Sequence, residues 1–461
     1  MQEQIIQTLQ DLRHYALGKG YEIELFYHEE DSYLMRFANS AISLNTNEHL
    51  IRLDITAYSG RKRASYALIT DLEKVDEMKS GIDTAAAMVE HAQPLFYQPT
   101  IPTFVESFLD ESGFDPVLAG MSSAEKLAYF NQAVKGLETG EIRSSGIISS
   151  GTNTIAQITT RSAHSQYFKT SDAQVSLVLS HPKFKWEVTA EQSAQEKDDL
   201  DPDSLHRDLA FLLEHYQQDT PQQLPLGRYN IVFGPAATAE MLSYMSYISY
   251  NGGSLKHGMS FLTEDQVGKK ILSEHFTLID DPDRRETYPF KRDLAGLIRK
   301  PWPIFEKGVF QGFLWSQDDA DEFSAKPTGH TVPHKSQVLC GGDQEVGSIQ
   351  ELVTLPRQQD LLYIPFLHYM NIVNPTKGII TASSRFGALL LKQDGSVVVP
   401  YNVRLTQSLL DIFGEGVAWL SKSIFPYNTS SSYGARNPTA ILLPRFMQVN
   451  GLEISHSNSS Y

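Results

Sequence analysis

The chain has 461 residues, and its 55 Asp and Glu against 39 Lys and Arg give a formal net charge of −16. This acidity argues against direct binding of nucleic acid, because a negative surface repels phosphate. The single cysteine excludes an intrachain disulfide and disfavours a cysteine-based structural zinc site. We expect a cytoplasmic, multidomain protein, since no signal peptide is visible and no window approaches about 18 uninterrupted apolar residues.

The first half of the chain carries both helical and strand patterns. Apolar residues at helical spacing predict helices over 4–17, from 71 to about 92, over 123–137 and around 206–216. Residues 93–112 contain three prolines and are expected to form a linker or a strapped loop. Strands are predicted at 21–28, 32–38, 49–58, 64–69, 141–151, 153–161, 165–171, 173–181 and 185–191. Short strands bounded by polar residues or glycine favour an antiparallel sheet.

A Gln- and Pro-rich stretch at 218–226 predicts a boundary, and the pattern beyond it is mostly β. A buried strand is predicted at 227–235, where it ends in a Gly-Pro pair. Residues 238–250 predict a helix whose tyrosines and methionines form a packed face. The clearest hairpin lies at 389–399, where two apolar runs flank the tight-turn pair Asp394-Gly395.

These patterns together predict an α+β protein with two domains. Residues 1–220 are expected to form an N-terminal α/β domain. Residues 221–461 are expected to form a larger, β-rich C-terminal domain with mostly antiparallel sheets. The serine-rich segment 428–438 is expected to be a surface loop.

The chain lacks the common short motifs of catalysis: no GxxxxGK[ST] loop, GxGxxG turn, GxSxG elbow or HExxH helix occurs. His330 and His334 have a ligand-like spacing, but Pro327 and Pro333 place them in a loop. With Cys340 they make a His/His/Cys metal cluster conceivable. The favoured interpretation is two loop histidines beside a buried cysteine in a strand. A Ser/His/Asp triad assembled from distant residues also stays open.

Several segments resemble the TldD/PmbA family, once called modulators of DNA gyrase. They occur in the family's order and are spread over most of the chain: 36–46, 60–67, 230–242, 327–353 and 373–395. The positions that carry the resemblance are Arg36, Asn39, Gly60, Arg61, Gly234, Pro235, Thr328, Gly329, His330, Asn374, Pro375 and Gly378. One departure is the turn after Pro375, where the acidic residue that often follows the glycine is replaced by Ile379.

The resemblance implies a cytoplasmic peptidase system of two related subunits. In its TldD-type subunit, HExxxH lies on the helix after the Gly-Pro strand, and a cysteine follows downstream. Carried over without gaps, the histidines fall at Ser243 and Ile248, the glutamate at Tyr244 and the cysteine near Phe386. The side chains at 243, 244 and 248 cannot bind zinc or activate a zinc-bound water. The chain therefore resembles the PmbA (TldE) type, with no catalytic residue and no metal of its own and with zinc expected in a TldD-type partner.

Three functional hypotheses follow from the sequence. The first is a non-metal-binding subunit of a heteromeric metallopeptidase, inactive alone, that helps to hold an extended peptide substrate along an exposed strand edge. The second is a self-contained homodimer that binds peptides without catalysis. The third is a metallopeptidase whose metal site has moved to His330, His334 and Cys340. None of them involves a membrane or direct contact with nucleic acid.

Overall fold

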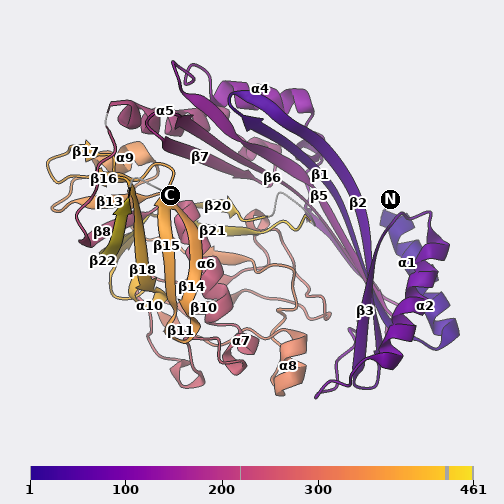
Figure 1. Cartoon of the computed structure of the whole chain (residues 1–461). Helices are drawn as coiled ribbons and strands as arrows, with labels where there is room; N and C mark the ends of the chain where they lie inside the picture. Colours follow the sequence, from indigo (N-terminus) through magenta and orange to yellow (C-terminus); the bar gives the residue numbers. More distant parts are fainter. Residues whose placement is uncertain (1, 219, 431–435, 459–461) are drawn as a thin grey trace.

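The computed structural model describes residues 2–218, 220–430 and 436–458 of the chain. Three β-sheets form its framework. In Figure 1 the long strands of the first sheet arc around the β-rich second half of the chain, with α1 and α2 near one end of the arc and α4 and α5 near the other. The predicted α+β class, with an N-terminal α/β region and a β-rich C-terminal part, is confirmed.

The first sheet has seven strands in the order β3-β2-β1-β5-β6-β4, and β7 also pairs with β6. All of its pairs are antiparallel except β4 with β6. Its strands are β1 (Glu22–Ala38), β2 (Ala41–Ser59), β3 (Lys62–Thr70), β4 (Phe108–Gly113), β5 (Arg143–Thr159), β6 (Ser165–His181) and β7 (Trp186–Ala194).

Several expectations about this sheet are wrong in detail. The strands predicted at 141–151 and 153–161 are one strand, β5, and those predicted at 165–171 and 173–181 are one strand, β6. The separate strands predicted at 21–28 and 32–38 are one strand, β1, because Glu29–Asp31 stay in the ladder opposite β2 instead of turning. The end of the proline-containing stretch 93–112 is also not loop. There β4 begins, pairing with β6, and the Phe108 ring packs 5.6 Å from that of Phe168.

Helices cover both ends of this sheet. Apolar faces of α1 and α2 bury Ile5, Leu9, Met78 and Ile82 against the strands. A capping box at Ser122 and Glu125 starts α4, as sequence pattern favours. The elements are α1 (Gln2–Lys19), α2 (Val75–His91), α3 (Pro116–Ala119), α4 (Ser123–Ala133), a 3-10 turn (Lys197–Asp199) and α5 (Pro202–Gln218).

The second half contains the other two sheets. One has the order β11-β10-β9-β12-β21-β20, and the other β14-β15-β18-β22-β8-β13-β16-β17, with β19 pairing β22. Most pairs are antiparallel; β12 with β21 and β13 with β8 are parallel. The six-stranded sheet is built from β9 (Leu278–Asp280), β10 (Trp302–Glu306), β11 (Val309–Phe310), β12 (Gln337–Leu339), β20 (Ile424–Asn428) and β21 (Ala440–Pro444).

The nine-stranded sheet carries the predicted hairpin as its terminal pair, β16 and β17, with Gly395 at φ +88° in the turn. Its strands are β8 (Gly227–Phe233), β13 (Leu361–Ile364), β14 (Phe366–Asn374), β15 (Ile379–Arg385), β16 (Leu389–Leu391), β17 (Val397–Val398), β18 (Asn402–Ser408), β19 (Val417–Leu420) and β22 (Met447–Asn458). The helices of this half are α6 (Pro235–Ile248), α7 (Gly252–Lys256), α8 (Gln317–Phe323), α9 (Ile349–Thr354) and α10 (Leu409–Ile412), with 3-10 turns at Glu264–Gln266, Arg285–Thr287 and Pro375–Lys377.

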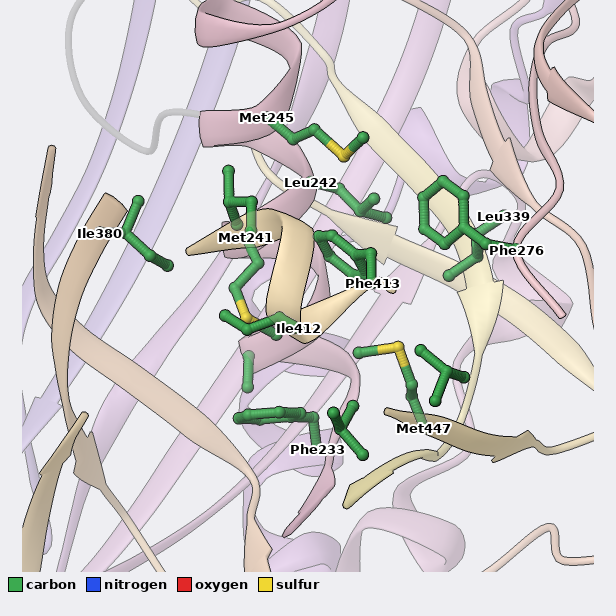
Figure 2. Packing of buried hydrophobic residues seen from close by; sticks show 14 of the residues in the cluster. Phe233, Met241, Leu242, Met245, Phe276, Leu339, Ile380, Ile412, Phe413 and Met447 are labelled. Carbon is green, nitrogen blue, oxygen red and sulfur yellow. The ribbon is translucent and has the colours of Figure 1, made fainter. Parts of the chain in front are cut away.

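Helix α6 lies at the centre of the largest hydrophobic core. Figure 2 shows Met241, Leu242 and Met245 of this helix among side chains from the surrounding strands and from the C-terminal end of α10, including Met447 of β22 and Phe413, which directly follows α10. All five are fully or almost fully buried. This burial explains why the sequence of α6 is apolar over most of its surface.

The two halves of the chain meet through buried polar contacts as well as apolar ones. Arg436 forms a buried ion pair with Asp172 of β6, with Nη2 2.7 Å from Oδ2. The segment predicted as a surface loop at 428–438 is therefore buried at both of its described ends, Asn428 and Arg436; residues 431–435 lie outside the described part. Within the described residues, no helix is long and apolar enough to cross a membrane.

Candidate functional site on helix α6

Helix α6 begins directly where β8 ends, at the Gly234-Pro235 pair. Proline suits the first turn of a helix because its missing N–H would have no partner there. A Cβ atom on Gly234 would lie 2.9 Å from the Cα atom of Pro365, so glycine is required for β8 and β13 to end this close together. These two residues of the family motif therefore fix where the helix starts.

One stripe of α6 is only partly covered by the core, with Ser243 and Tyr247 exposed and Glu240 and Tyr244 half-buried. It consists of Glu240, Ser243, Tyr244 and Tyr247, at the i, i+3, i+4 spacing of one helix face. Tyr247 is 57% exposed, so the expectation that all the tyrosines of this helix pack is wrong for this one. That spacing of polar residues in an apolar helix is a signal that sequence inspection could have used to find the stripe.

The stripe lies beside β14, a terminal strand of the nine-stranded sheet. Tyr244 Oη donates a hydrogen bond to the carbonyl oxygen of Met370 in this strand, at 2.6 Å. Among the described residues β14 pairs only with β15, so its other edge is without a strand partner. Tyr369 and Val373 of β14 are 65% and 57% exposed. Helix stripe and strand edge together form an accessible surface along a strand that, among the described residues, has no second strand partner.

The positions that correspond to the HExxxH motif do not converge on this surface. Ser243 is exposed, and its hydroxyl donates to the carbonyl of Ala239 within the helix, at 3.0 Å. Ile248 is fully buried on another side of the helix. Burial raises the pKa of Tyr244 above its ordinary value, and the nearby Glu240 adds to this. The stripe holds hydroxyls and one carboxyl, and no imidazole.

The position of the downstream cysteine is occupied by an aromatic residue. Phe386 adopts a positive φ of 60° and packs edge-on against Phe366 at 5.3 Å between ring centroids. The guanidinium of Arg385 lies 4.3 Å from the centroid of the Phe386 ring. The ring contact and the cation–π contact stabilise the chain at the end of β15.

A hollow between the two halves of the chain opens at the N-terminal end of α6. It is lined by Pro235, by Glu191 of β7 and by Phe425 and Tyr427 of β20, among others. Tyr427 Oη donates to one carboxyl oxygen of Glu191 at 2.7 Å, and Ser176 donates to the other at 2.9 Å. Burial nevertheless raises the pKa of Glu191 above its ordinary value. The hollow therefore has both apolar and polar walls, and it favours the neutral, protonated form of the Glu191 carboxyl group.

His330 lies in a buried hydrogen-bonded group away from this surface. Its Nε2 atom is 3.0 Å from Asp280 Oδ2, and its Nδ1 atom is 2.8 Å from the hydroxyl of Thr328. Arg299 also pairs with Asp280, at 2.5 Å. Burial disfavours the Asp280 anion, but the hydrogen bond from His330 and the charge of Arg299 outweigh it and hold the pKa of Asp280 below its usual range.

His334 and Cys340 do not join His330 in a metal site. His334 Nε2 lies 3.0 Å from the carbonyl of Tyr288, and burial lowers the pKa of His334 to about 4. Burial raises the pKa of the Cys340 thiol, which disfavours the thiolate that binds metals. In the part of the chain that the structure describes, no group of three or more His, Cys, Asp or Glu side chains could hold a metal ion.

The remaining motif positions shape turns. Asn39 has φ +51° in the tight turn between β1 and β2, while Gly60, at φ +55°, precedes Arg61 in the turn between β2 and β3. Arg36 is exposed near the end of β1, at an irregularity in its pairing with β2. Gly329 has φ +80° before His330.

The Asn-Pro-x-x-Gly motif is a turn as well. The Asn374 side chain accepts a hydrogen bond from the Lys377 amide at 3.1 Å, capping the 3-10 turn that Pro375 begins. Gly378 has φ +62°, and a Cβ atom there would lie 2.8 Å from the Phe261 ring. The turn forms without the missing acidic residue, and Ile379 starts β15.

Comparison with known proteins agrees with this arrangement. Residues 226–455 match the family model of the PmbA/TldA metallopeptidase C-terminal domain. A "Metalloprotease" of Methanothermobacter thermautotrophicus is 29% identical over 106 residues, which is 23% of this chain and 23% of that protein. The chain thus matches about a quarter of the length of this curated relative.

Solved structures with the same fold cover nearly the whole chain. TldE from Thermococcus kodakarensis superposes with a TM-score of 0.80 at 16% identity, over 97% of this chain and 100% of that one. A protein proposed as a modulator of a DNA gyrase from Thermotoga maritima gives 0.76 at 14% identity, over 97% and 99%. Its counterpart from Bacteroides thetaiotaomicron gives 0.74 at 16% identity, over 97% and 98%. The chain belongs to the TldD/PmbA family.

Proposed function

We propose that this chain is the non-metal-binding, PmbA/TldE-type subunit of a heteromeric metallopeptidase that acts on peptides or unfolded proteins. The observation that carries the proposal is the chemistry of α6. Where the family's metal-binding helix needs two histidines and a glutamate, this helix has Ser243, Ile248 and Tyr244, and Ile248 is buried in the core. Zinc and the zinc-activated water would come from a TldD-type partner.

The role of this subunit would be to hold substrate near the partner's metal. An extended peptide can add to the free edge of β14 through main-chain hydrogen bonds, which do not depend on its sequence. Tyr247 and Tyr369, both exposed, offer aromatic surface to its side chains. We place the complex in the cytoplasm, because a single cysteine suits a reducing compartment. The acidic charge argues against direct contact with DNA.

The test is to measure metal content and peptide hydrolysis, first on this chain alone and then after mixing it with an HExxxH-containing relative from the same organism. We expect much less than one metal ion per chain, no hydrolysis alone, and hydrolysis in the mixture above that of the partner alone. Stoichiometric metal, or hydrolysis by this chain alone, would overturn the proposal. A stable homodimer that binds peptides and does not respond to the partner would favour the non-catalytic alternative.

A matched pair of variants localises the effect within the mixture. Tyr247→Ala removes an exposed aromatic ring beside β14 and should raise the KM for peptide about 5-fold or more, the effect of losing about 1 kcal/mol of contact energy. Ile69→Ala removes an apolar side chain of similar exposure (66%, against 57% for Tyr247) from β3 in the first sheet and should leave KM unchanged. Equal effects of the two variants would contradict a peptide site at the helix stripe.

A further inference from the structure

A second, larger hollow is lined by one residue of β8 and by none of α6. It measures about 560 Å³, and its lining residues come from the middle of β8, the start of β13, the loop before β13, β19 and β22, together with Gln344. This volume is within the range of sites that bind small molecules. None of its lining residues belongs to α6 or β14, so the hollow is separate from the helix stripe.

Side-chain amides dominate the walls of this hollow. Six of its lining residues carry one: Asn230, Gln344, Gln358, Gln359, Gln448 and Asn450. Of all its lining residues within the described chain, only Arg357 is charged. The absence of carboxylates disfavours a cation as ligand, and the polar walls disfavour an apolar one. A single guanidinium on a chain of net charge −16 is a weak attraction for a highly charged anion.

Part of this amide group is held rigidly. Trp419 Nε1 donates to Gln448 Oε1 at 2.7 Å, and Gln448 Nε2 donates to Asn450 Oδ1 at 2.8 Å. Asn230 Nδ2 donates to Gln359 Oε1 at 2.6 Å. These bonds orient the indole and four of the amides before any ligand arrives, which lowers the entropy cost of binding.

The other two amides are open. Within the described residues, the side chains of Gln344 and Gln358 make no hydrogen bond, although both line the hollow. Arg357 is fixed beside them, since its Nε atom donates to the carbonyl of Leu355 at 3.2 Å and Nη2 donates to that of Val353. The hollow thus presents unused donors and acceptors next to an ordered aromatic ring.

We propose that this hollow binds a saccharide. An amide offers a donor and an acceptor side by side, and vicinal hydroxyl groups of a sugar offer the same pair in return. The apolar face of a sugar ring can pack on an indole such as Trp419, while its hydroxyls pair with Gln344 and Gln358. This activity is independent of the metallopeptidase partner and of the α6 stripe.

The test uses the purified full-length chain without a partner. It is screened on an immobilised panel of neutral and acidic mono- to tetrasaccharides, and the sugars that bind are titrated by calorimetry. Gln344→Ala and Gln358→Ala should each weaken binding about 5-fold, the effect of losing one hydrogen bond between neutral groups. Both side chains lack intramolecular partners, so these variants should fold as the parent does. Gln4→Ala, on the exposed face of α1, is the control and should leave binding unchanged.

Two results would overturn the proposal. One is that no saccharide on the panel binds, or that binding is the same in the two hollow variants as in the parent. The other is that short peptides with a free C-terminal carboxylate bind, that sugars do not, and that Gln344→Ala weakens the peptides; the hollow would then be a peptide site. Neither result bears on whether the chain assembles with an HExxxH subunit, so failure here is distinguishable from failure of the proposed function.

Discussion

Asp280 shows how this fold accommodates a buried charge. Asp280 and Arg299 are buried together, and His330 completes the group, so the carboxylate is stabilised as an anion. His334, four residues from His330, contacts the Tyr288 carbonyl instead of a carboxylate. The two histidines that sequence spacing suggested as joint metal ligands thus have different partners: a carboxylate for His330 and a main-chain carbonyl for His334.

The lowered pKa of His334 predicts a pH dependence of stability. Burial, together with the positive charge of Arg299, lowers this pKa to about 4, against the opposing effects of the Tyr288 carbonyl and of Asp280. In the unfolded chain His334 binds a proton below about pH 6.5, whereas in the folded chain it binds the proton only below about pH 4. The contribution of His334 to the free energy of unfolding is therefore present above pH 6.5 and is lost as pH falls toward 4.

Urea unfolding at a series of pH values from 4 to 7 measures this effect. In His334→Gln, which cannot titrate, the fall of unfolding free energy between pH 6.5 and 4 should be clearly shallower than in the parent. His91→Gln is the control, because His91 is exposed at the end of α2. If the parent and His334→Gln lose stability with the same pH slope, His334 is not the group responsible.

At the scale of helices and strands, sequence pattern predicts those elements whose signals are local. The hairpin of β16 and β17 follows from the Asp394-Gly395 pair, and the start of α4 from its capping residues. The length of β1 does not follow, because the acidic run Glu29–Asp31, which includes the typical turn residue Asp31, favours a turn. In the strand, Glu30 has a distant partner, because the Arg436 amide donates to it, and Glu29 accepts from the nearby Tyr27 at 2.9 Å.

The candidate site likewise has features that a local sequence pattern predicts and features that depend on contacts between distant residues. The Gly-Pro start of α6 and the loss of the HExxxH ligands are legible in the sequence, because each is a short motif. The association of α6 with the edge of β14 is not, since it depends on a contact between Tyr244 and Met370 across 126 residues of chain. Likewise the amide-lined hollow is assembled from residues between 230 and 450, none of which forms a motif on its own.

Tyr244→Phe tests how α6 and β14 are joined. The change keeps the ring but removes the hydrogen bond to the Met370 carbonyl, which should cost about 1 kcal/mol. Because β14 has a strand partner on one side only, we expect this loss locally, as about 5-fold faster amide hydrogen exchange within β14. Tyr247→Phe is the control, since no hydrogen bond of its hydroxyl occurs among the described residues. Unchanged exchange in Tyr244→Phe would show that other contacts hold the strand.

At the scale of the whole molecule, the segment 428–438 connects the β-rich half of the chain to the curved first sheet. The serine-rich composition of 428–438 indicates a surface loop, yet its described ends reach into the first sheet. Asn428 Nδ2 donates both to Asp172, at 3.2 Å, and to the hydroxyl of Tyr288, at 3.0 Å. A polar segment can lie buried when its partners are supplied by another part of the chain, and composition alone carries no information about such partners.

Arg436 is the residue on which this connection should depend most. Its Nε and Nη2 atoms donate to the two carboxylate oxygens of Asp172 at 2.8 and 2.7 Å, and Nη1 donates to Ser149 at 3.1 Å. Both members of the ion pair are at most 2% exposed. Arg436→Met should therefore leave the Asp172 carboxylate buried without its countercharge and lower the free energy of unfolding by about 3–5 kcal/mol, measured by urea titration.

Two further variants separate this cause from simple loss of packing. Arg436→Met combined with Asp172→Asn removes the unpaired charge, so the double variant should recover part of the stability that Arg436→Met loses. Lys422→Met breaks an exposed pair with Glu345 inside the second half and should change the free energy of unfolding by no more than about 1 kcal/mol. If Arg436→Met lowers the free energy of unfolding no more than Lys422→Met does, apolar contacts hold the two halves together. If the double variant is no more stable than Arg436→Met alone, the loss of stability comes from lost packing and not from the buried charge.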